Sequence, residues 1–187
     1  MHVFLQGPPG IGKSTIIRKT VALLSEERRF NVGGFVTYKS GDGDRNIYIS
    51  APGGSLTGNP VSGGARAGRA FAQSGPDGAT NYRPEVFDAF VTDMVSEISG
   101  KDIICMDELG FIESEAPLFQ RAIAALLDGN IPILGALREK RRDKVISWHA
   151  PIKAHARVTL LRVDESNRDA LPELVYESLR RVNRYGG

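Results

Sequence analysis

The residues best suited to chemistry begin near the first residue of the chain, in the stretch GPPGIGKS at residues 7–14. Its glycines let the backbone curl so that successive N–H groups point inward and form a nest for phosphate oxygens. The stretch follows an apolar run and precedes a helical pattern, and the helix would add free N–H donors and a partial positive charge at its start. The pattern G-x-x-x-x-G-K-[ST] in this context predicts a cradle for a nucleotide triphosphate.

The residues of this cradle have distinct expected roles. Lys13 would reach the β- and γ-phosphates, and the Ser14 hydroxyl is the hard oxygen ligand that Mg²⁺ prefers. Thr15 would approach the α-phosphate from the helix start. The alternative, an ordinary glycine turn between a strand and a helix, is disfavoured because pattern, context and position agree. The predicted nucleotide-binding residues here are Gly7, Pro8, Pro9, Gly10, Ile11, Gly12, Lys13, Ser14 and Thr15.

A second candidate region, DIICMDELG at residues 102–110, supplies carboxylates. Apolar residues carry a predicted strand to its carboxyl end, where Asp107 would face the crevice beside the cradle and anchor Mg²⁺ through a coordinated water. Glu108 follows directly and is placed to deprotonate a water in line with the γ-phosphate. Because a kinase needs an acceptor pocket instead of a base that activates water, the acidic pair favours hydrolysis. The alternative for Glu108 is a cap or salt bridge to the next segment.

Hydrolysis also needs positive charge on the developing transition state. Arg138 follows a predicted strand and would emerge at the same edge of the sheet as Asp107, and Arg168 at the start of the last predicted helix is a second candidate. A solvated or ion-paired surface position is the alternative for both arginines. Trp148 either stacks on a nucleobase or packs under a loop, and packing is favoured.

Alternating strand and helix patterns predict the scaffold that positions these residues. Strand patterns cover residues 3–5, 33–39, 46–50, 102–107, 131–137 and 156–163, and helix patterns cover residues 14–29, 84–99, 115–129, 139–148 and 165–185, the last helix beginning near residue 167 or 168. The alternation indicates an α/β fold in three layers, with helices on both faces of a mostly parallel sheet. We expect a single domain over residues 1–187, with a glycine-rich hairpin and loop region at about residues 40–83.

Composition excludes several classes of protein. The formal net charge is +2, which neither demands nor excludes an anionic polymer as a partner. The basic run REKRRDK at residues 138–144 lacks interleaved aromatic residues, so nucleic-acid binding is disfavoured. The single cysteine, Cys105, suits a reducing compartment, and no apolar run approaches the roughly 20 residues that span a bilayer. We therefore expect a cytoplasmic protein without a membrane segment.

Four stretches resemble one known family, the cancer-related nucleoside-triphosphatases and their thermophile homologues. FLQGPPGIGKSTIIRK resembles the family's opening, GGFVTYK its GF-[YV]-T strand, IICMDELGFIES its D-E-[IL]-G-x-[ML]-E stretch, and VDESNRDAL its N-R-D element. The resemblance covers most of the chain. The first motif is shared by a whole superfamily, whereas the DELGFIE and NRD elements together are more specific.

The resemblance implies a P-loop NTPase fold of the additional-strand, catalytic-glutamate class. It also implies slow, Mg²⁺-dependent hydrolysis of ATP, GTP and other nucleoside triphosphates to the diphosphate and phosphate, with Glu108 as the water-activating residue. The second nucleotide-contacting segment would be Ile103, Ile104, Cys105, Met106, Asp107, Glu108, Leu109 and Gly110. Two features depart from the family. Phe111 stands where members often have lysine, and residues 53–78 match poorly, so base-side contacts do not carry over.

We therefore predict an enzyme, a nucleoside-triphosphate phosphohydrolase. Its predicted catalytic residues are Glu108, Lys13 and Arg138, and its predicted Mg²⁺ ligands are Ser14 and Asp107. Two alternatives stay open, and no protein partner can be named. A nucleotide or small-molecule kinase would close the glycine-rich stretch as a lid, with Arg66 and Arg69 clamping phosphates. A nucleotide-gated binding module would use hydrolysis only to time the release of a partner.

Overall fold

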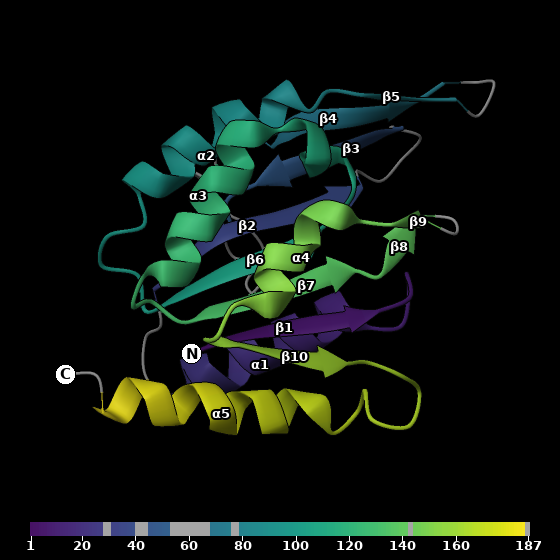
Figure 1. The fold of residues 1–187 in the computed structure, drawn as a ribbon. Coiled ribbons are helices and arrows are strands. Elements are labelled where there is room, and N and C mark those ends of the chain that lie inside the picture. The colour runs from purple at the N-terminus through teal and green to yellow at the C-terminus, as the bar shows by residue number, and fades with distance from the viewer. Residues whose placement is uncertain (28–30, 40–44, 53–67, 76–78, 142–143, 186–187) are drawn as a thin grey trace.

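A computed structural model shows an α/β fold built around an eight-stranded sheet (Figure 1). The structure describes residues 1–27, 31–39, 45–52, 68–75, 79–141 and 144–185. The strand order is β10-β1-β7-β6-β2-β3-β4-β5. The parallel strands are β1 (His2–Gly7), β2 (Val32–Lys39), β6 (Ile103–Leu109), β7 (Ile133–Arg138) and β10 (Val158–Arg162). The strands β3 (Asn46–Ser50), β4 (Arg69–Ser74) and β5 (Thr80–Tyr82) extend the sheet with antiparallel pairing.

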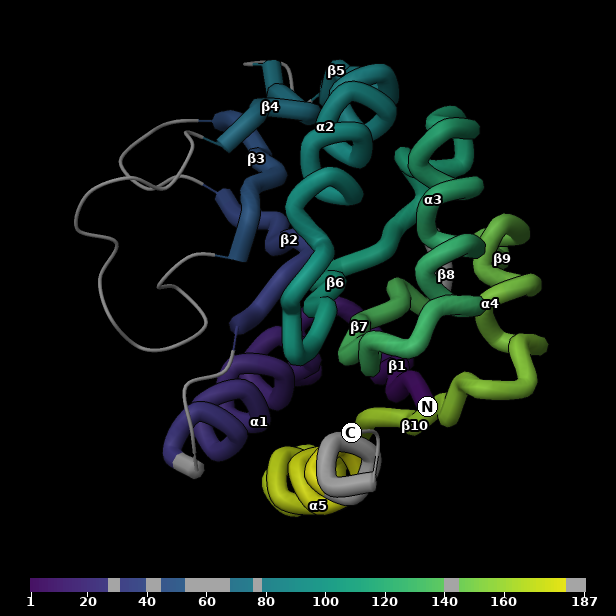
Figure 2. Tube along the Cα trace, turned by 90° about the vertical axis from the view of Figure 1, so that its left-hand side faces the viewer, coloured from purple at the N-terminus to yellow at the C-terminus, as the bar shows by residue number. Residues whose placement is uncertain are grey.

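Helices cover both faces of this sheet. Figure 2 shows α1 and α5 on one side and α2, α3 and α4 on the other. The helix bounds are α1 (Lys13–Glu27), α2 (Glu85–Ser96), α3 (Pro117–Asp128), α4 (Ala150–Ala154) and α5 (Leu171–Tyr185). The predicted three-layer arrangement, with helices on both faces of a mostly parallel sheet, is confirmed. Among the described residues, no helix combines the length and apolar character needed to cross a membrane.

Each face of the sheet has its own hydrophobic core. Side chains alternate along β1, so Phe4 enters the core under α2 and α3, whereas Val3 and Leu5 enter the core under α1 and α5. The first core is rich in aromatic rings, and Phe119 makes edge contacts with Phe35 and Phe87 at centroid distances of 5.5 and 5.3 Å. The two cores hold the parallel strands in register. The carboxyl ends of these strands meet at one edge of the sheet.

The predicted helix at residues 139–148 is wrong. This stretch contains the short antiparallel strands β8 (Lys140–Arg141) and β9 (Lys144–Val145), followed by a 3₁₀ helix (Ser147–His149). The physical reason is that residues 139–144 are all charged, so a helix there would have no apolar stripe to bury. The helix α4 comes directly afterwards, with a proline in its first turn, and was missed.

The last helix begins later than expected, at Leu171 instead of residue 167 or 168. Local side chains bind the backbone of the preceding loop and compete with helix formation. The Asp164 carboxylate accepts the Ser166 N–H at 2.9 Å, and the Asn167 side-chain oxygen accepts the Asp164 N–H at 3.0 Å. The NRD element therefore belongs to a turn before α5 that is held by side-chain hydrogen bonds.

The glycine-rich region is described only in part. Residues 53–67, with Arg66, lie outside the described residues. The strand β4 lies within the region and was not predicted as a strand. Its first residue, Arg69, is paired with Asp93 of α2 at 2.5 Å and lies over the Phe90 ring, so this arginine is held by α2 and not by the cradle.

Candidate active site

The predicted cradle lies where β1 ends and α1 begins. Gly10 has φ 78° and Gly12 has φ 115°, a backbone region that glycine adopts without steric cost. These two turns bring the chain from Gly7, at the end of β1, to the first residues of α1 within a few residues. The local sequence therefore produces the curled backbone that the phosphate-binding pattern predicts.

Lys13 lies folded back over this cradle and is only 4% exposed. Its Nζ donates to the carbonyl oxygens of Gly7 at 2.9 Å and Pro8 at 3.0 Å. The same Nζ lies 3.0 Å from Glu108 Oε2. The ammonium group therefore links the cradle backbone to the acidic segment at the end of β6.

Ser14 and Asp107 meet across the same crevice. The Ser14 hydroxyl, in the first turn of α1, donates to Asp107 Oδ1 at the end of β6 at 2.9 Å, although β7 separates β1 from β6 in the sheet order. Burial raises the pKa of Asp107 to about 6, and the hydrogen bond from Ser14 opposes that rise. The predicted pair of Mg²⁺ ligands is thus brought together, as two hard oxygen donors within hydrogen-bond distance.

Glu108 bridges two cations. One carboxylate oxygen contacts Lys13, and the other lies 3.2 Å from Arg138 Nε. Its backbone N–H donates to Thr37 Oγ1 of β2 at 3.4 Å. Both ionic partners come from α1 and β7, whereas the alternative, a cap or salt bridge, expected a partner in the following segment.

A bulge in β6 explains how two successive carboxylates serve one crevice. Met106 pairs with Gly135 and Leu109 pairs with Leu137, so Asp107 and Glu108 together lie opposite a single residue of β7. Successive side chains of a regular strand point to opposite faces of the sheet, and an extra residue changes their direction locally. This irregularity could not be predicted from the sequence.

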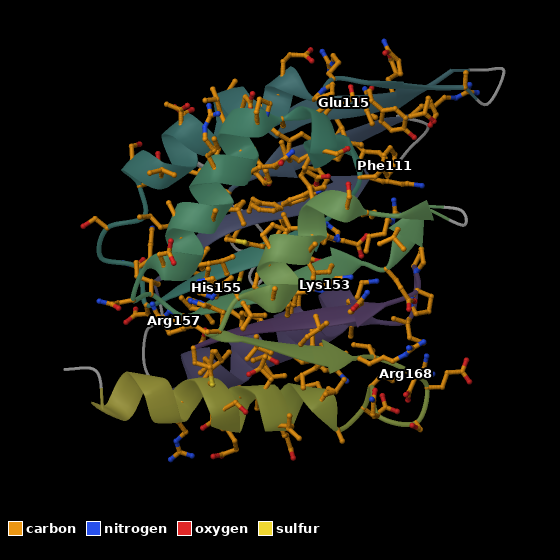
Figure 3. The ribbon with its side chains drawn as sticks, in the orientation of Figure 1. Phe111, Glu115, Lys153, His155, Arg157 and Arg168 are labelled. Atoms are coloured by element: carbon orange, nitrogen blue, oxygen red, sulfur yellow. The ribbon has the colours of Figure 1, made fainter. Side chains whose placement is uncertain are left out.

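Of the two candidate arginines, the structure brings Arg138 to the site. Arg138 pairs in register with Gly7, the first residue of the cradle. Its contact with Glu108 is an ion pair and not a hydrogen bond, since the buried Nε has no hydrogen-bond partner among the described residues. Arg168 is exposed in the turn between β10 and α5 (Figure 3).

Two residues hold the segment after Glu108 through contacts with Gly110 that the sequence analysis did not predict. The Gly110 N–H donates to Glu113 Oε2 at 3.1 Å, and Trp148 Nε1 donates to the Gly110 oxygen at 2.7 Å. Burial raises the pKa of Glu113 to about 7, and the N–H donors of Glu113 itself and Gly110 oppose that rise. Glu113 ends the DELGFIE motif, so a signal for it was present. Trp148 also packs edge-on against Phe119, which confirms the packing prediction.

In the predicted nucleotide-contacting segment at residues 103–110, the apolar side chains point into the two hydrophobic cores and away from the crevice. These side chains fill the two cores and are at most 1% exposed: Ile103, Ile104, Cys105, Met106 and Leu109. Burial also raises the pKa of the Cys105 thiol, so it remains protonated and is not a nucleophile. Within this segment, the side chains of Asp107 and Glu108 and the backbone of Gly110 are the groups that line the crevice and its surroundings.

The fold and the site together define a P-loop nucleotide-binding protein, because the strand, the curled loop and the helix that carries Lys13 and Ser14 occur in the required order. Comparison with known families is more specific. A family model described as NTPase matches residues 2–176, so the chain belongs to this NTPase family. The resemblance predicted from the sequence is thereby confirmed, and with it the class of enzyme.

Named relatives and solved structures agree with this assignment. The nucleoside-triphosphatase THEP1 of Methanosarcina barkeri is 26% identical over 185 residues, which are 97% of this chain and 99% of that protein. The protein of the same name from Thermofilum pendens is 28% identical over 91% of each chain. The crystal structure of THEP1 from Aquifex aeolicus matches with a TM-score of 0.70 at 18% identity, over 96% of this chain and 99% of that chain. The solution structure of a human cancer-related nucleoside triphosphatase gives a TM-score of 0.70 at 22% identity, over 96% and 97%.

Proposed function

We propose that this protein hydrolyses nucleoside 5′-triphosphates, ATP and GTP among them, to the diphosphate and phosphate in a Mg²⁺-dependent reaction. Its relatives in Methanosarcina barkeri and Thermofilum pendens are named nucleoside-triphosphatases. One observation carries the proposal: the Glu108 carboxylate faces the cradle, with Lys13 on one oxygen and Arg138 beside the other.

The arrangement places a base and two cations around one point. In hydrolysis, Glu108 takes a proton from the attacking water. Lys13 and Arg138 neutralise the charge that builds up on the transferred phosphoryl group, which is the largest contribution expected in phosphoryl transfer. Arg138 is suited to this role because it lies beside Glu108 and its guanidinium group, which is partly exposed, can donate to a phosphate oxygen.

The donor set at the crevice fits Mg²⁺. Mg²⁺ uses hard oxygen ligands, commonly one or two protein groups together with phosphate oxygens. The Ser14 hydroxyl and the Asp107 carboxylate are such groups, and they lie 2.9 Å apart. We propose Ser14 as a direct ligand and Asp107 as an anchor through a coordinated water. When bound, the cation neutralises charge on the β- and γ-phosphates.

Two finer assignments belong to the same proposal. We propose that residues 1–187 form a single domain, a view supported by strands from residue 2 to residue 162 that share a sheet. We also propose a cytoplasmic location, in keeping with a single cysteine, Cys105, that is free and buried. Nucleoside triphosphates are the proposed partners, and nucleic acid is disfavoured by the charge pattern.

The test is the variant Glu108→Gln, which keeps the shape of the side chain and removes the base. Phosphate release from ATP with Mg²⁺ should fall by about 10²- to 10⁴-fold, the usual contribution of a general base, while nucleotide binding is retained. The control is Glu115→Gln, which changes an exposed carboxylate close by in the chain. If Glu108→Gln hydrolyses ATP at the parent rate, the assignment of the base is wrong.

A further inference from the structure

A pocket lies beside Glu108 on the side of β2, whereas the cradle lies on the side of β1. Its cavity volume is about 250 Å³, slightly below the roughly 300–1,000 Å³ of drug-sized sites, so it suits a small ligand with a single ring. We call it the ring pocket, and its principal residues are Ile47, Phe71, Tyr82, Phe111, Glu108 and Arg138. Figure 3 places Phe111 at the edge of the sheet where the parallel strands end, the usual position of ligands in α/β proteins.

The walls of the ring pocket suit a flat apolar group. Tyr82 and Phe111 meet edge to face at a centroid distance of 5.2 Å, and Phe71 and Ile47 supply further apolar surface. Aromatic walls of this kind hold a ring by burial and by offset or edge contacts. The exposed Lys39 side chain also lines the pocket and adds a positive charge.

The pocket shares two residues with the candidate active site. Glu108 and Arg138 line it, and Glu108 also contacts Lys13 of the cradle at 3.0 Å. A hydroxyl group held beside Glu108 in the ring pocket would therefore lie next to the same carboxylate that contacts the cradle. Water has no apolar surface to bury, so a water molecule gains nothing from aromatic walls. The sequence analysis favoured hydrolysis because a kinase needs an acceptor pocket, and the structure places a pocket directly beside Glu108.

We propose that the ring pocket binds a second substrate, a small molecule with a flat ring and an alcohol group, and that this alcohol takes the phosphoryl group in competition with water. The inference rests on the proposed function, because it uses the same cradle and the same base. In the transfer, the alcohol oxygen bonds to the γ-phosphorus while the bond from that phosphorus to the β–γ bridging oxygen breaks. The alcohol proton goes to the Glu108 carboxylate, and the nucleoside diphosphate leaves with the bridging oxygen.

The experiment compares two alcohols as acceptors. The protein is incubated with ATP and Mg²⁺ and with either methanol or 2-phenylethanol at equal concentration, and ³¹P NMR measures the alkyl phosphate and the inorganic phosphate. The ratio of transfer to alcohol over transfer to water should be at least about tenfold higher for 2-phenylethanol, since burying a phenyl ring is worth that factor or more. This ratio does not depend on the amount of active protein.

Two variants test where the ring binds. Tyr82→Ala and Phe111→Leu each remove an aromatic wall, and each should reduce the preference for 2-phenylethanol several-fold while phosphate release without alcohol is unchanged. Phe111→Leu keeps apolar volume, so the test still stands if Tyr82→Ala does not fold. The matched control is Leu174→Ala, which truncates an apolar side chain 52% exposed on α5.

The outcomes separate this inference from the proposed function. If ATP is not hydrolysed without alcohol, the proposed function fails. If ATP is hydrolysed and the two alcohols give equal ratios, the ring pocket is not an acceptor site and the hydrolase assignment stands. A ring preference that survives both Tyr82→Ala and Phe111→Leu would also overturn the inference, because the ring would then bind elsewhere.

Discussion

The two sides of the crevice are built in different ways. The cradle is a run of contiguous residues whose binding groups are mostly backbone N–H donors, shaped by Gly10 and Gly12. The opposite side, which we call the acid wall, consists of Glu108 and the residues that hold it and its segment: Thr37, Gly110, Glu113, Arg138 and Trp148. These residues come from β2, from β6 and the residue after it, from β7, and from the 3₁₀ helices Ile112–Glu115 and Ser147–His149. The acid wall is thus assembled from segments more than 100 residues apart in the chain.

This difference indicates that the two sides have different functions. A backbone nest binds any triphosphate tail, and its shape depends only on local dihedral angles. In the proposed function, the acid wall selects the group that attacks the phosphorus, and its shape depends on side chains placed by tertiary packing. We therefore expect changes in the cradle to weaken nucleotide binding and changes in the acid wall to alter turnover.

Apart from the loss expected for Glu108→Gln, the largest effect is expected at Lys13, the residue that joins the two regions. Lys13→Ala removes the cation shared by the cradle carbonyls and Glu108, and phosphate release should fall by about 10²- to 10³-fold or more. Lys19→Ala, at an exposed position of α1, is the matched control. A Lys13→Ala rate within severalfold of the parent would show that the two sides do not act together.

Burial of Glu113 in the acid wall should make the free energy of unfolding depend on pH. Its folded pKa is raised by burial from 4.5 to about 7, so the native state binds more protons than the unfolded state between these pH values. Stability is therefore lost as pH rises from 4.5 to 7, by up to about 3 kcal/mol at ~1.4 kcal/mol per pKa unit.

Glu113→Gln should remove most of this slope, because the amide oxygen still accepts the Gly110 N–H and carries no charge. Urea unfolding of parent and variant at pH 5 and pH 8 measures the difference. The exposed Glu115→Gln variant should keep the parent slope. Equal slopes in parent and Glu113→Gln would mean that the carboxyl is not a buried neutral acid.

In the cradle, Gly12→Ala should weaken nucleotide binding. A Cβ at φ 115° costs about 1–3 kcal/mol of strain although no atom lies within 4 Å of it. Affinity for a nucleoside triphosphate, measured by calorimetry, should fall about tenfold, since 1.4 kcal/mol is a factor of ten. Gly100→Ala is the matched control, because Gly100 has φ 74° and equally open surroundings in the turn before β6. Comparable loss of affinity in both variants would contradict a local role for the cradle dihedral.

The smallest effect is expected for Trp148→Phe, which keeps a ring in the core and removes the hydrogen bond to the Gly110 oxygen. One such bond is worth about 1 kcal/mol, so kcat should fall about fivefold while KM is unchanged. Steady-state kinetics measure the effects on kcat and on KM separately. Tyr176→Phe, which removes a polar group from a partly buried ring on α5, is the control. A rise in KM at constant kcat would assign Trp148 to binding instead of positioning.

Much of the site could be predicted because it follows local rules. The pairing of Ser14 with Asp107 follows from the start of a helix and the end of a parallel strand, which meet at the same edge of the sheet. Arg138 ends a strand by the same rule and reaches Glu108. Arg168 lies instead in the turn before α5, whose start is held by side-chain hydrogen bonds of Asp164 and Asn167. The predicted helix at residues 139–148 was wrong because the charges of residues 139–144 do not distinguish a helix from a hairpin.

By itself, the sequence determined the cradle, the alternation of strands and helices, and the family, since each depends on contiguous residues and their dihedral preferences. Only the tertiary structure decided that Asp107 and Glu108 share a bulge, that Glu113 and Trp148 hold Gly110, and that a ring pocket adjoins Glu108. The physical reason is that these contacts depend on the register of neighbouring strands. That register is determined by the packing of two cores at once, and a linear pattern of residues does not specify it.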